Sequence, residues 1–448
     1  MRRLRWLSAV LSVVLLVGMG LPALAGHTTD PRSNMNPLGH IEEPRSLINP
    51  AIGNINVHTD IAFWRNRAFQ GSWRGFNIRD ISSSRNPTTV SSTSCEGPQG
   101  DLVVWRNILV RTWDAPAGTP GPFGAGLMCD GVPVPVGWEG IHIFDVKNLN
   151  DPQVVAAVQL PCGSHTATAV PDLENNRLLV YSSPSAGAAC NGFDIIEIPL
   201  DDPSDASYVR AVDAMHNCHD IGVILGDALR AACAGGTGFR VLSLGGPSGG
   251  SLDNPALLFH VDEPGVTIGH SATWTWDGEV IVFGHEPSGG VQAQCKATDT
   301  VTEKSYFFYD GDTGTKLGQW TLPRPQTGSE NCTLHNLNVV PLNGRYVLVH
   351  GSYQSGTSVV DFTDPANAVE VGWSDPPPLP VPAGTPFCTV DGTGCDVGGA
   401  WSSYWYNGLI YETNITEGLN LFKFTGDETA GALRLDHLNP QTQEFSLP

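Results

Sequence analysis

The stretch that decides the fold is Gly356-Thr-Ser-Val-Val-Asp361-Phe362, in which a glycine precedes alternating apolar residues and an acidic residue follows five positions on. The same pattern recurs along the chain at Gly75 to Asp80, Gly140 to Asp145 and Gly192 to Glu197. A further copy begins at Gly238, where Ser243 replaces the acidic residue, and two looser copies begin at Ser305 and Gly418. Side chains that alternate with a period of two are typical of a β-strand, and a polar turn with proline follows several copies, as at Asp364-Pro365. The pattern therefore predicts one short strand in each repeat.

Each repeat strand is preceded by two more strand patterns. In the first unit, residues 58–64 and 67–73 predict two strands joined by a turn at Arg65-Asn66. In the fifth unit, Asp277-Gly278 is a strong hairpin signal. Counting the strand after the proline turn, each unit predicts four antiparallel strands, and no helical periodicity of useful length occurs. Seven such units predict an all-β fold, a seven-bladed β-propeller of four-stranded antiparallel blades.

The N-terminus has the pattern of an export signal. Three arginines precede an apolar run from Trp6 to Val17, and small residues end the segment at Ala25. The run is too short to span a membrane. We therefore expect residues 1–25 to be a cleaved secretory signal peptide and the mature protein to be secreted or extracytoplasmic. We expect residues 26–57 to be an N-terminal extension or a ring-closing segment, 58–440 a single propeller and 441–448 a C-terminal tail. The sequence leaves open whether residues 47–57 join the last blade or cap the ring.

Charge and cysteine content narrow the class of partner and the compartment. The formal net charge is -21, and loss of the three signal arginines makes it -24. A surface this acidic disfavours nucleic acid and anionic membranes. Ten cysteines in an exported chain predict disulfides, and a metal-thiolate site is disfavoured because no CxxC pair occurs. Their positions favour sequential pairing, which gives Cys95–Cys129, Cys162–Cys190, Cys218–Cys233, Cys295–Cys332 and Cys388–Cys395.

The repeat resembles the LVIVD repeats of secreted bacterial β-propeller proteins. The stretches that carry the resemblance best are Gly163-Ser-His-Thr-Ala-Thr-Ala-Val-Pro-Asp172 and residues 353–365. The resemblance extends over nearly the whole mature chain and implies the propeller fold. It implies no shared reaction, cofactor or active residue.

Histidines recur at one position of the repeat, the start of the first strand in each unit. Since the first strand of a propeller blade lines the central channel, we expect these imidazoles to form a ring at one channel mouth. The end of the second strand returns to the same face, and this adds an acid and two more histidines. Imidazole and carboxylate groups bind zinc, copper or iron. The metal-ligand candidates are His58, His165, His219, His270, His335, His285, Glu286 and His350.

Two interpretations of the histidines stay open from the sequence. A repeated histidine can serve structure alone, by bonding a loop or the next blade, or it can hold copper or zinc. The first leads to a secreted protein that binds a protein, glycan or small-molecule ligand at the channel mouth. The second leads to a metal-dependent, copper-type oxidase, similar to the propeller oxidases of the methanethiol oxidase and selenium-binding family. A third hypothesis is carbohydrate binding through Trp401 and Tyr404, for which core packing is the alternative role.

Overall fold

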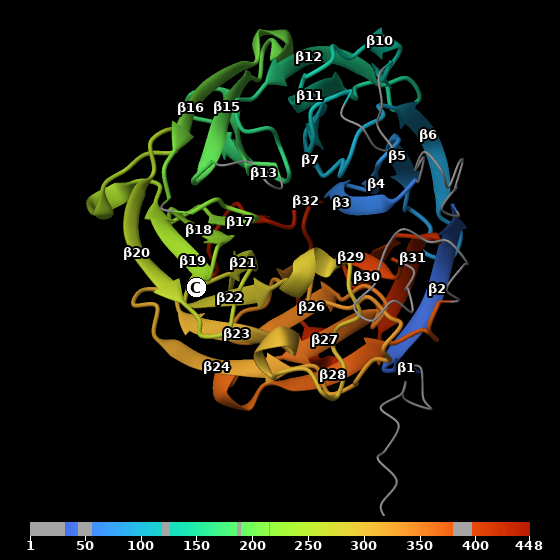
Figure 1. Ribbon diagram of the computed structural model, residues 1–448, viewed down its shortest axis with the longest axis vertical. Coiled ribbons are helices and arrows are strands. Elements are labelled where there is room, and N and C mark those ends of the chain that lie inside the picture. Colours follow the sequence, from blue (N-terminus) through green and yellow to red (C-terminus); the bar gives the residue numbers. More distant parts are fainter. Residues whose placement is uncertain (1–31, 44–55, 119–125, 186–189, 215, 380–396) are drawn as a thin grey trace, which may run out of the picture.

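Seven antiparallel sheets surround a central channel in the computed structural model (Figure 1), which describes residues 32–43, 56–118, 126–185, 190–214, 216–379 and 397–448. Each sheet is one blade, with its first strand innermost. The prediction of a seven-bladed all-β propeller with four-stranded blades is confirmed. Among the described residues, helix is confined to six short 3-10 turns, and none of them could cross a membrane.

The blades follow one another around the ring in sequence order. Blade one comprises β3 (His58–Trp64), β4 (Arg67–Ser72), β5 (Gly75–Asp80) and β6 (Thr88–Ser94). Blade two comprises β7 (Leu102–Trp105), β8 (Ile108–Trp113), β11 (Gly140–Asp145) and β12 (Gln153–Gln159). Blade three comprises β13 (Ala167–Asp172), β14 (Arg177–Ser182), β15 (Phe193–Pro199) and β16 (Ser207–Val212). Blade four comprises β17 (Ile221–Ile224), β18 (Arg230–Gly235), β19 (Gly238–Ser243) and β20 (Ala256–Asp262).

The remaining blades keep this order. Blade five comprises β21 (Gly269–Trp274), β22 (Val280–His285), β23 (Ser305–Asp310) and β24 (Lys316–Thr321). Blade six comprises β25 (Leu337–Val339), β26 (Val347–Gly351), β27 (Thr357–Asp361) and β28 (Val369–Ser374), with β1 (Arg32–Ser33) added outside it. Blade seven contains β29 (Ala400–Tyr406), β30 (Leu409–Asn414) and β31 (Gly418–Phe424). The short strands β9 (Met128–Cys129) and β10 (Val132–Pro133) form a hairpin in the insertion of blade two.

The glycine that begins the repeat and the acidic residue that ends it each have a structural role. Gly356 has φ +72°, and a Cβ there would lie 1.9 Å from the carbonyl oxygen of Ser374, so only glycine allows this approach of the neighbouring strand. At the other end, the carboxylate of Asp361 accepts a hydrogen bond of 2.9 Å from the backbone N–H of Thr363. This contact stabilises the turn that starts the next strand.

The N-terminal strand closes the ring. β2 (Met35–Glu42) is the outermost strand of blade seven and pairs antiparallel with β31, from Met35 opposite Phe424 to Glu42 opposite Gly418. The first and last parts of the chain therefore share one sheet (Figure 1). The closing strand lies upstream of residues 47–57, of which 47–55 are outside the described residues.

The C-terminal segment crosses the far end of the channel. β32 (His437–Leu438) pairs with β3, and β33 (Thr442–Gln443) runs parallel to β17. Between them the Asn439 side chain exchanges two hydrogen bonds, of 2.8 and 2.9 Å, with the backbone of Val104. The Thr442 hydroxyl donates to the carbonyl oxygen of Ala169 at 2.7 Å. The segment thus joins the inner strands of neighbouring blades and forms a floor across the channel.

Four disulfides connect neighbouring parts of the blades. They are Cys95–Cys129, Cys162–Cys190, Cys218–Cys233 and Cys295–Cys332. The predicted sequential pairing is confirmed for these four. The predicted Cys388–Cys395 pair lies outside the described residues.

Candidate functional site

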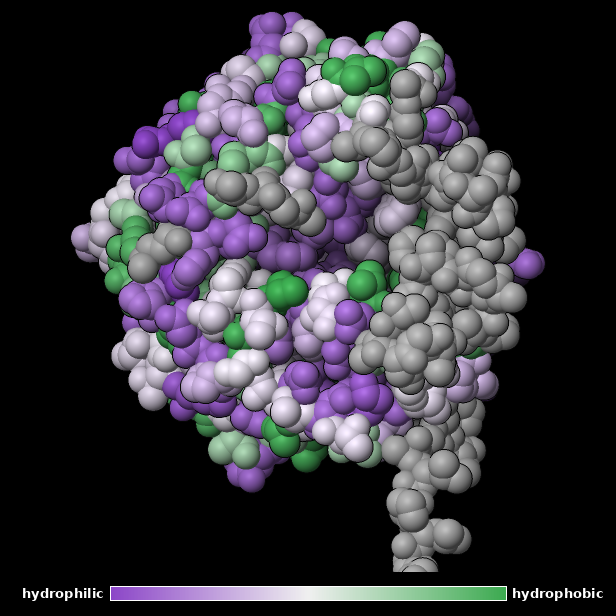
Figure 2. Space-filling view, in the orientation of Figure 1, coloured by the Kyte–Doolittle hydropathy of each residue, from purple (hydrophilic) through white to green (hydrophobic). Residues whose placement is uncertain are grey.

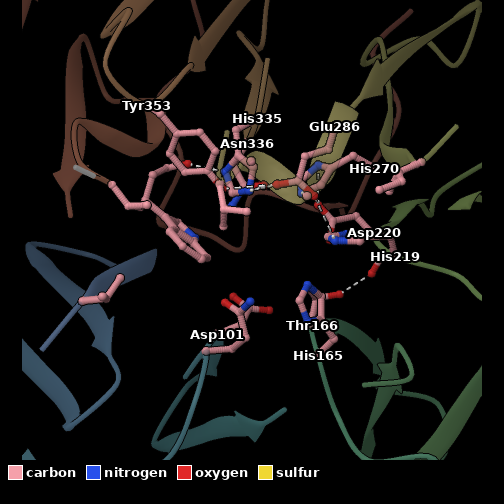
Figure 3. Close-up of a pocket in the computed structure, with 18 of the residues that line it drawn as sticks. Asp101, His165, Thr166, His219, Asp220, His270, Glu286, His335, Asn336 and Tyr353 are labelled. Atoms are coloured by element: carbon pink, nitrogen blue, oxygen red, sulfur yellow. Dashed lines mark hydrogen bonds and ion pairs between the residues drawn. The ribbon is translucent and has the colours of Figure 1, made fainter. Parts of the chain in front are cut away.

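A cavity of about 400 Å³ occupies the channel on the side where the inner strands begin. The face of the molecule shown in Figure 2 is hollowed at the centre of the ring, and hydrophilic residues line the hollow. In the close-up of the cavity (Figure 3), His335, Glu286 and Tyr353 lie across from His165 and Asp101. Side chains from different blades therefore face one another across a single space.

The repeat itself positions the histidines. The backbone N–H of His165 bonds to the carbonyl oxygen of Ser183 at 2.9 Å, and that of His335 bonds to Gly351 at 3.0 Å. His219 makes the equivalent bond to Ala234 at 2.6 Å. Each bond fixes the start of an inner strand to the second strand of the same blade, so equivalent residues of neighbouring blades meet at the channel.

Four of the sequence-predicted histidines line the cavity side by side. The ring centroids are 4.4 Å apart from His165 to His219, 4.0 Å from His219 to His270 and 4.3 Å from His270 to His335. Glu286 lines the same cavity. The structure thus brings together five of the eight candidate residues.

The other three candidate histidines do not line the cavity. His58 places its Nε2 2.6 Å from the carbonyl oxygen of Glu43, and Val57 faces the cavity in its place. His285 precedes Glu286 at the end of a strand and turns the other way, with its Nε2 3.3 Å from the backbone nitrogen of Thr267. His350 is buried between Tyr306 and Trp320, and its Nδ1 is bonded to the Ser352 hydroxyl at 2.9 Å.

The carboxylate of Glu286 is the centre of the cluster. One oxygen, Oε1, lies 3.6 Å from the Nε2 of His335. The other, Oε2, lies 3.6 Å from the Nε2 of His219 and 3.8 Å from that of His270. These distances exceed hydrogen-bond length. Three imidazole nitrogens therefore face the two oxygens of one carboxylate without hydrogen-bonding to them.

Neighbouring groups orient two of these imidazoles. The Nδ1 of His335 is 2.6 Å from the carbonyl oxygen of Trp401, and the Nδ1 of His219 is 3.2 Å from the carboxylate of Asp220. Since a carbonyl oxygen only accepts, His335 must carry its proton on Nδ1. Its Nε2 lone pair then faces Glu286, which is the arrangement found around metal-bound histidines.

Burial keeps the two deepest imidazoles neutral. The pKa of His270 is lowered well below its ordinary value by burial and by the neighbouring histidines, His219 first. Burial also lowers the pKa of His335, and the nearby Glu286 carboxylate offsets only part of this effect. Neutral imidazole is the form that donates a lone pair to a metal.

His165 differs from the other three histidines of the cavity. Its burial opposes protonation, but the carboxylate of Asp114, 2.9 Å from Nδ1, outweighs burial and raises the pKa to about 9, with help from Asp220 and Glu286. His165 therefore carries positive charge at neutral pH and balances part of the negative charge in the cavity.

Two buried carboxyl groups lie on the blade one and blade two side of the channel. Asp101 lines the cavity, and its carboxyl group is hydrogen-bonded to that of Asp60. Burial raises the pKa of both groups, and the Asp60 carboxylate raises that of Asp101 further, so the pair shares a proton. Asp60 also accepts a 3.1 Å hydrogen bond from Gln441, which connects the pair to the C-terminal floor.

Sequence reasoning missed Asp101, Asp114 and Tyr353. Asp101 directly precedes β7, the inner strand of blade two, as Asp220 directly precedes β17 in blade four, so this repeat position was the signal that could have found it. Asp114 begins the insertion of blade two, and Tyr353 follows the second strand of blade six; neither position carries a repeat signal. Tyr353 donates a 3.2 Å hydrogen bond to Glu286.

Trp401 and Tyr404, which the sequence suggested as a carbohydrate-binding pair, lie in different surroundings. Trp401 lines the cavity, whereas Tyr404 is fully buried in the core. A further group of possible metal ligands, Cys95, Cys129 and His142, is unsuitable for a metal because its cysteines are joined in a disulfide.

The seven sheets themselves define the class of the protein, a seven-bladed β-propeller. No protein-family model matches the chain, and no curated protein matches it. Among solved structures, the β-propeller domain of Cps50 (Swd1) from Myceliophteria thermophila is 9% identical with a TM-score of 0.49, over 87% of this chain and 99% of that chain. The N-terminal domain of Nup159 is 12% identical with a TM-score of 0.48, over 89% and 97% of the two chains. A chain of the mitotic checkpoint complex is 12% identical with a TM-score of 0.46, over 94% and 98%.

Proposed function

We propose that this chain is a secreted binding protein of the LVIVD-repeat type whose central cavity holds a divalent transition metal ion, zinc or copper. Residues 1–25 would direct export, and the propeller would span residues 58–440 together with the ring-closing strand β2. His270, His335 and Glu286 would be the metal ligands. The observation that carries the proposal is the convergence of these donors at 3.6 and 3.8 Å around one carboxylate.

The spacing of the donors fits a metal of this kind. Zinc binds histidine nitrogen and carboxylate oxygen at about 2.1 Å in tetrahedral geometry, so two of its ligands lie about 3.4 Å apart. The Nε2 of His335 is 3.6 Å from Oε1 of Glu286, the Nε2 of His270 is 3.8 Å from Oε2, and the ligand atoms of the three residues lie within 4.8 Å of one another. Side-chain rotations that shorten these distances would complete the coordination.

A purely structural role explains His270 less well. Its side chain is 1% exposed, yet its Nδ1 has no hydrogen-bond partner among the described residues. A buried imidazole retained for structure is expected to satisfy both nitrogens, since an unpaired buried polar group costs about 1–3 kcal/mol. The Nδ1 of His270 faces the Asp220 carboxylate at 3.8 Å, beyond hydrogen-bond length, while its Nε2 lies 3.8 Å from Glu286 and would be the atom that binds the metal.

The proposed set of two histidines and one glutamate leaves a coordination position open. Sites with three protein ligands bind water or substrate at the fourth position, whereas structural zinc sites use four protein ligands. We therefore favour a site that binds a small ligand. The copper-type oxidase hypothesis would use the same residues, and oxygen consumption by the copper-loaded protein separates oxidation from binding.

Elemental analysis of protein exported to an oxidising compartment and purified without an affinity tag tests the proposal. We expect one zinc or copper per chain, lost in His270→Ala and kept in His260→Ala, which replaces an exposed histidine on the outer strand of blade four. Absence of bound metal after challenge with zinc and copper would overturn the proposal and favour a binding protein without metal.

A further inference from the structure

The cavity has two chemically different walls. The donor groups described above form one wall, from blades three to six. The other wall carries an apolar patch: Val57 and Tyr353 are buried there, and the partly exposed Trp73 and Trp401 pack against them. The cavity lining also includes two polar groups outside the donor wall, the Tyr353 hydroxyl, which is bonded to Glu286, and the Asp101 carboxyl group. Both walls line the same cavity, so a ligand would meet polar donors on one side and apolar surface on the other.

Trp401 connects the two walls. Its ring lies 5.0 Å from the ring of His335 at an interplanar angle of 74°, and 6.0 Å from that of Tyr353 at 71°. Its backbone carbonyl oxygen orients His335 at 2.6 Å. The indole is partly exposed to the cavity. One residue thus fixes a proposed metal ligand through its main chain and offers an aromatic surface through its side chain.

The size of the cavity limits the ligand. A cavity of about 150 Å³ is enough to hold benzene, and this cavity has a volume of about 400 Å³. A ligand with one or two rings fits this space. A peptide side chain would also fit, but the apolar wall offers few of the polar contacts that a main chain would need.

Resting on the metal site proposed above, we propose that the cavity binds a small molecule with a planar apolar body and a single anionic oxygen or sulfur head group. Phenolates, hydroxamates, carboxylates and thiolates belong to this class. The head group takes the open metal position beside Glu286 and His335, and the apolar body lies against Trp401. Burial of the body on an aromatic surface supplies affinity, and the head group supplies orientation.

Two hydroxamates that share a head group test this inference. Zinc-loaded protein is titrated calorimetrically with benzohydroxamate and with acetohydroxamate, which lacks the ring. We expect benzohydroxamate to bind about tenfold more tightly or better, because the ring is removed from water. The Trp401→Ala variant is expected to lose most of this preference and to keep both its zinc and its affinity for acetohydroxamate, since the carbonyl that orients His335 remains. Trp401→Phe is expected to restore part of the preference.

The experiment distinguishes failure of the metal proposal from failure of the ligand proposal. Zinc content is measured before any hydroxamate is added, so a protein without zinc overturns the metal proposal on its own. Bound zinc with equal affinity for the two hydroxamates would overturn the assigned ligand class and leave the metal site standing. Loss of zinc in Trp401→Ala and also in Trp401→Phe would show that the indole supports the metal site and not the ligand body.

Discussion

The Nδ1 of His335 donates a hydrogen bond of 2.6 Å to the carbonyl oxygen of Trp401 and so joins blade six to blade seven. The bond uses the main chain of Trp401, so it holds the imidazole whatever side chain occupies position 401. It also decides which nitrogen of His335 faces Glu286. The geometry of the proposed metal site therefore depends on how two adjacent blades meet.

Replacement of Glu286 by glutamine tests the centre of that site. The amide keeps the shape of the side chain but removes the negative charge that faces three imidazoles. Loss of a residue that only hydrogen-bonds to a metal ligand lowers metal affinity by roughly 10–100-fold. Since Glu286 is a proposed ligand itself, we expect zinc affinity to fall by more than this. Competition with a chromophoric chelator measures the change. Glu174→Gln, at an exposed turn, is the matched control. Equal affinities in the two variants would remove Glu286 from the site.

The buried His350 predicts a pH dependence of stability. Burial lowers its pKa to about 3 in the folded protein, against about 6.5 in the unfolded chain. Between these two pKa values, His350 is protonated in the unfolded chain and neutral in the folded protein. The contribution of His350 to stability is therefore complete above pH 6.5 and is lost as the pH falls toward 3. At pH 4.5 the loss is about 3 kcal/mol.

Urea unfolding at several pH values measures this loss. We expect the free energy of unfolding of His350→Gln to fall less steeply between pH 6.5 and 4.5 than that of the unmodified protein. The same variant keeps its metal, because residue 350 is outside the cavity. Parallel pH profiles would contradict the assignment.

The disulfide between Cys218 and Cys233 predicts a loss of stability on removal. The two residues are 15 positions apart, and closing a loop of this length stabilises the folded state by about 3 kcal/mol. The double variant Cys218→Ala and Cys233→Ala should lower the free energy of unfolding by this amount in a denaturant titration. Metal affinity should also fall, because His219, which follows Cys218 directly, packs with its ring 4.0 Å from that of the proposed ligand His270. An unchanged free energy of unfolding would mean that this disulfide does little to restrict the unfolded chain.

The C-terminal floor predicts a graded effect of truncation. A chain that ends at Asp436 loses the two bonds between Asn439 and Val104 and the ring of His437, which stacks 4.4 Å from Trp64. We expect a stability loss of about 3 kcal/mol or more. Acrylamide should quench tryptophan fluorescence more strongly, because the channel would be open at both ends. A chain that ends at Leu447, which lacks only the exposed Pro448, is the control and should change little. Equal quenching of the two chains would refute the sealing role.

The repeat carried most of the predictable information. Because each copy fixes the same strand register, alignment of the copies predicted the blades and placed His165, His219, His270 and His335 in one column. The alignment could not show where His58 turns, because the pairing of β3 with β4 shifts between His58 and Ile61. Nor could it find Asp114 or Tyr353, which reach the cavity from segments outside the repeated strands.

The pairing of β2 with β31 imposes an order of events on the nascent chain. The ring cannot close until residues near 420 have been made and have met residues near 40, and contacts this distant in sequence form slowly. The cavity takes side chains from the first and the last blades, Val57 and Trp401 among them, so it forms late. With the export proposed above, a metal that needs this cavity would be acquired after export, and the ions available in that compartment would set its identity.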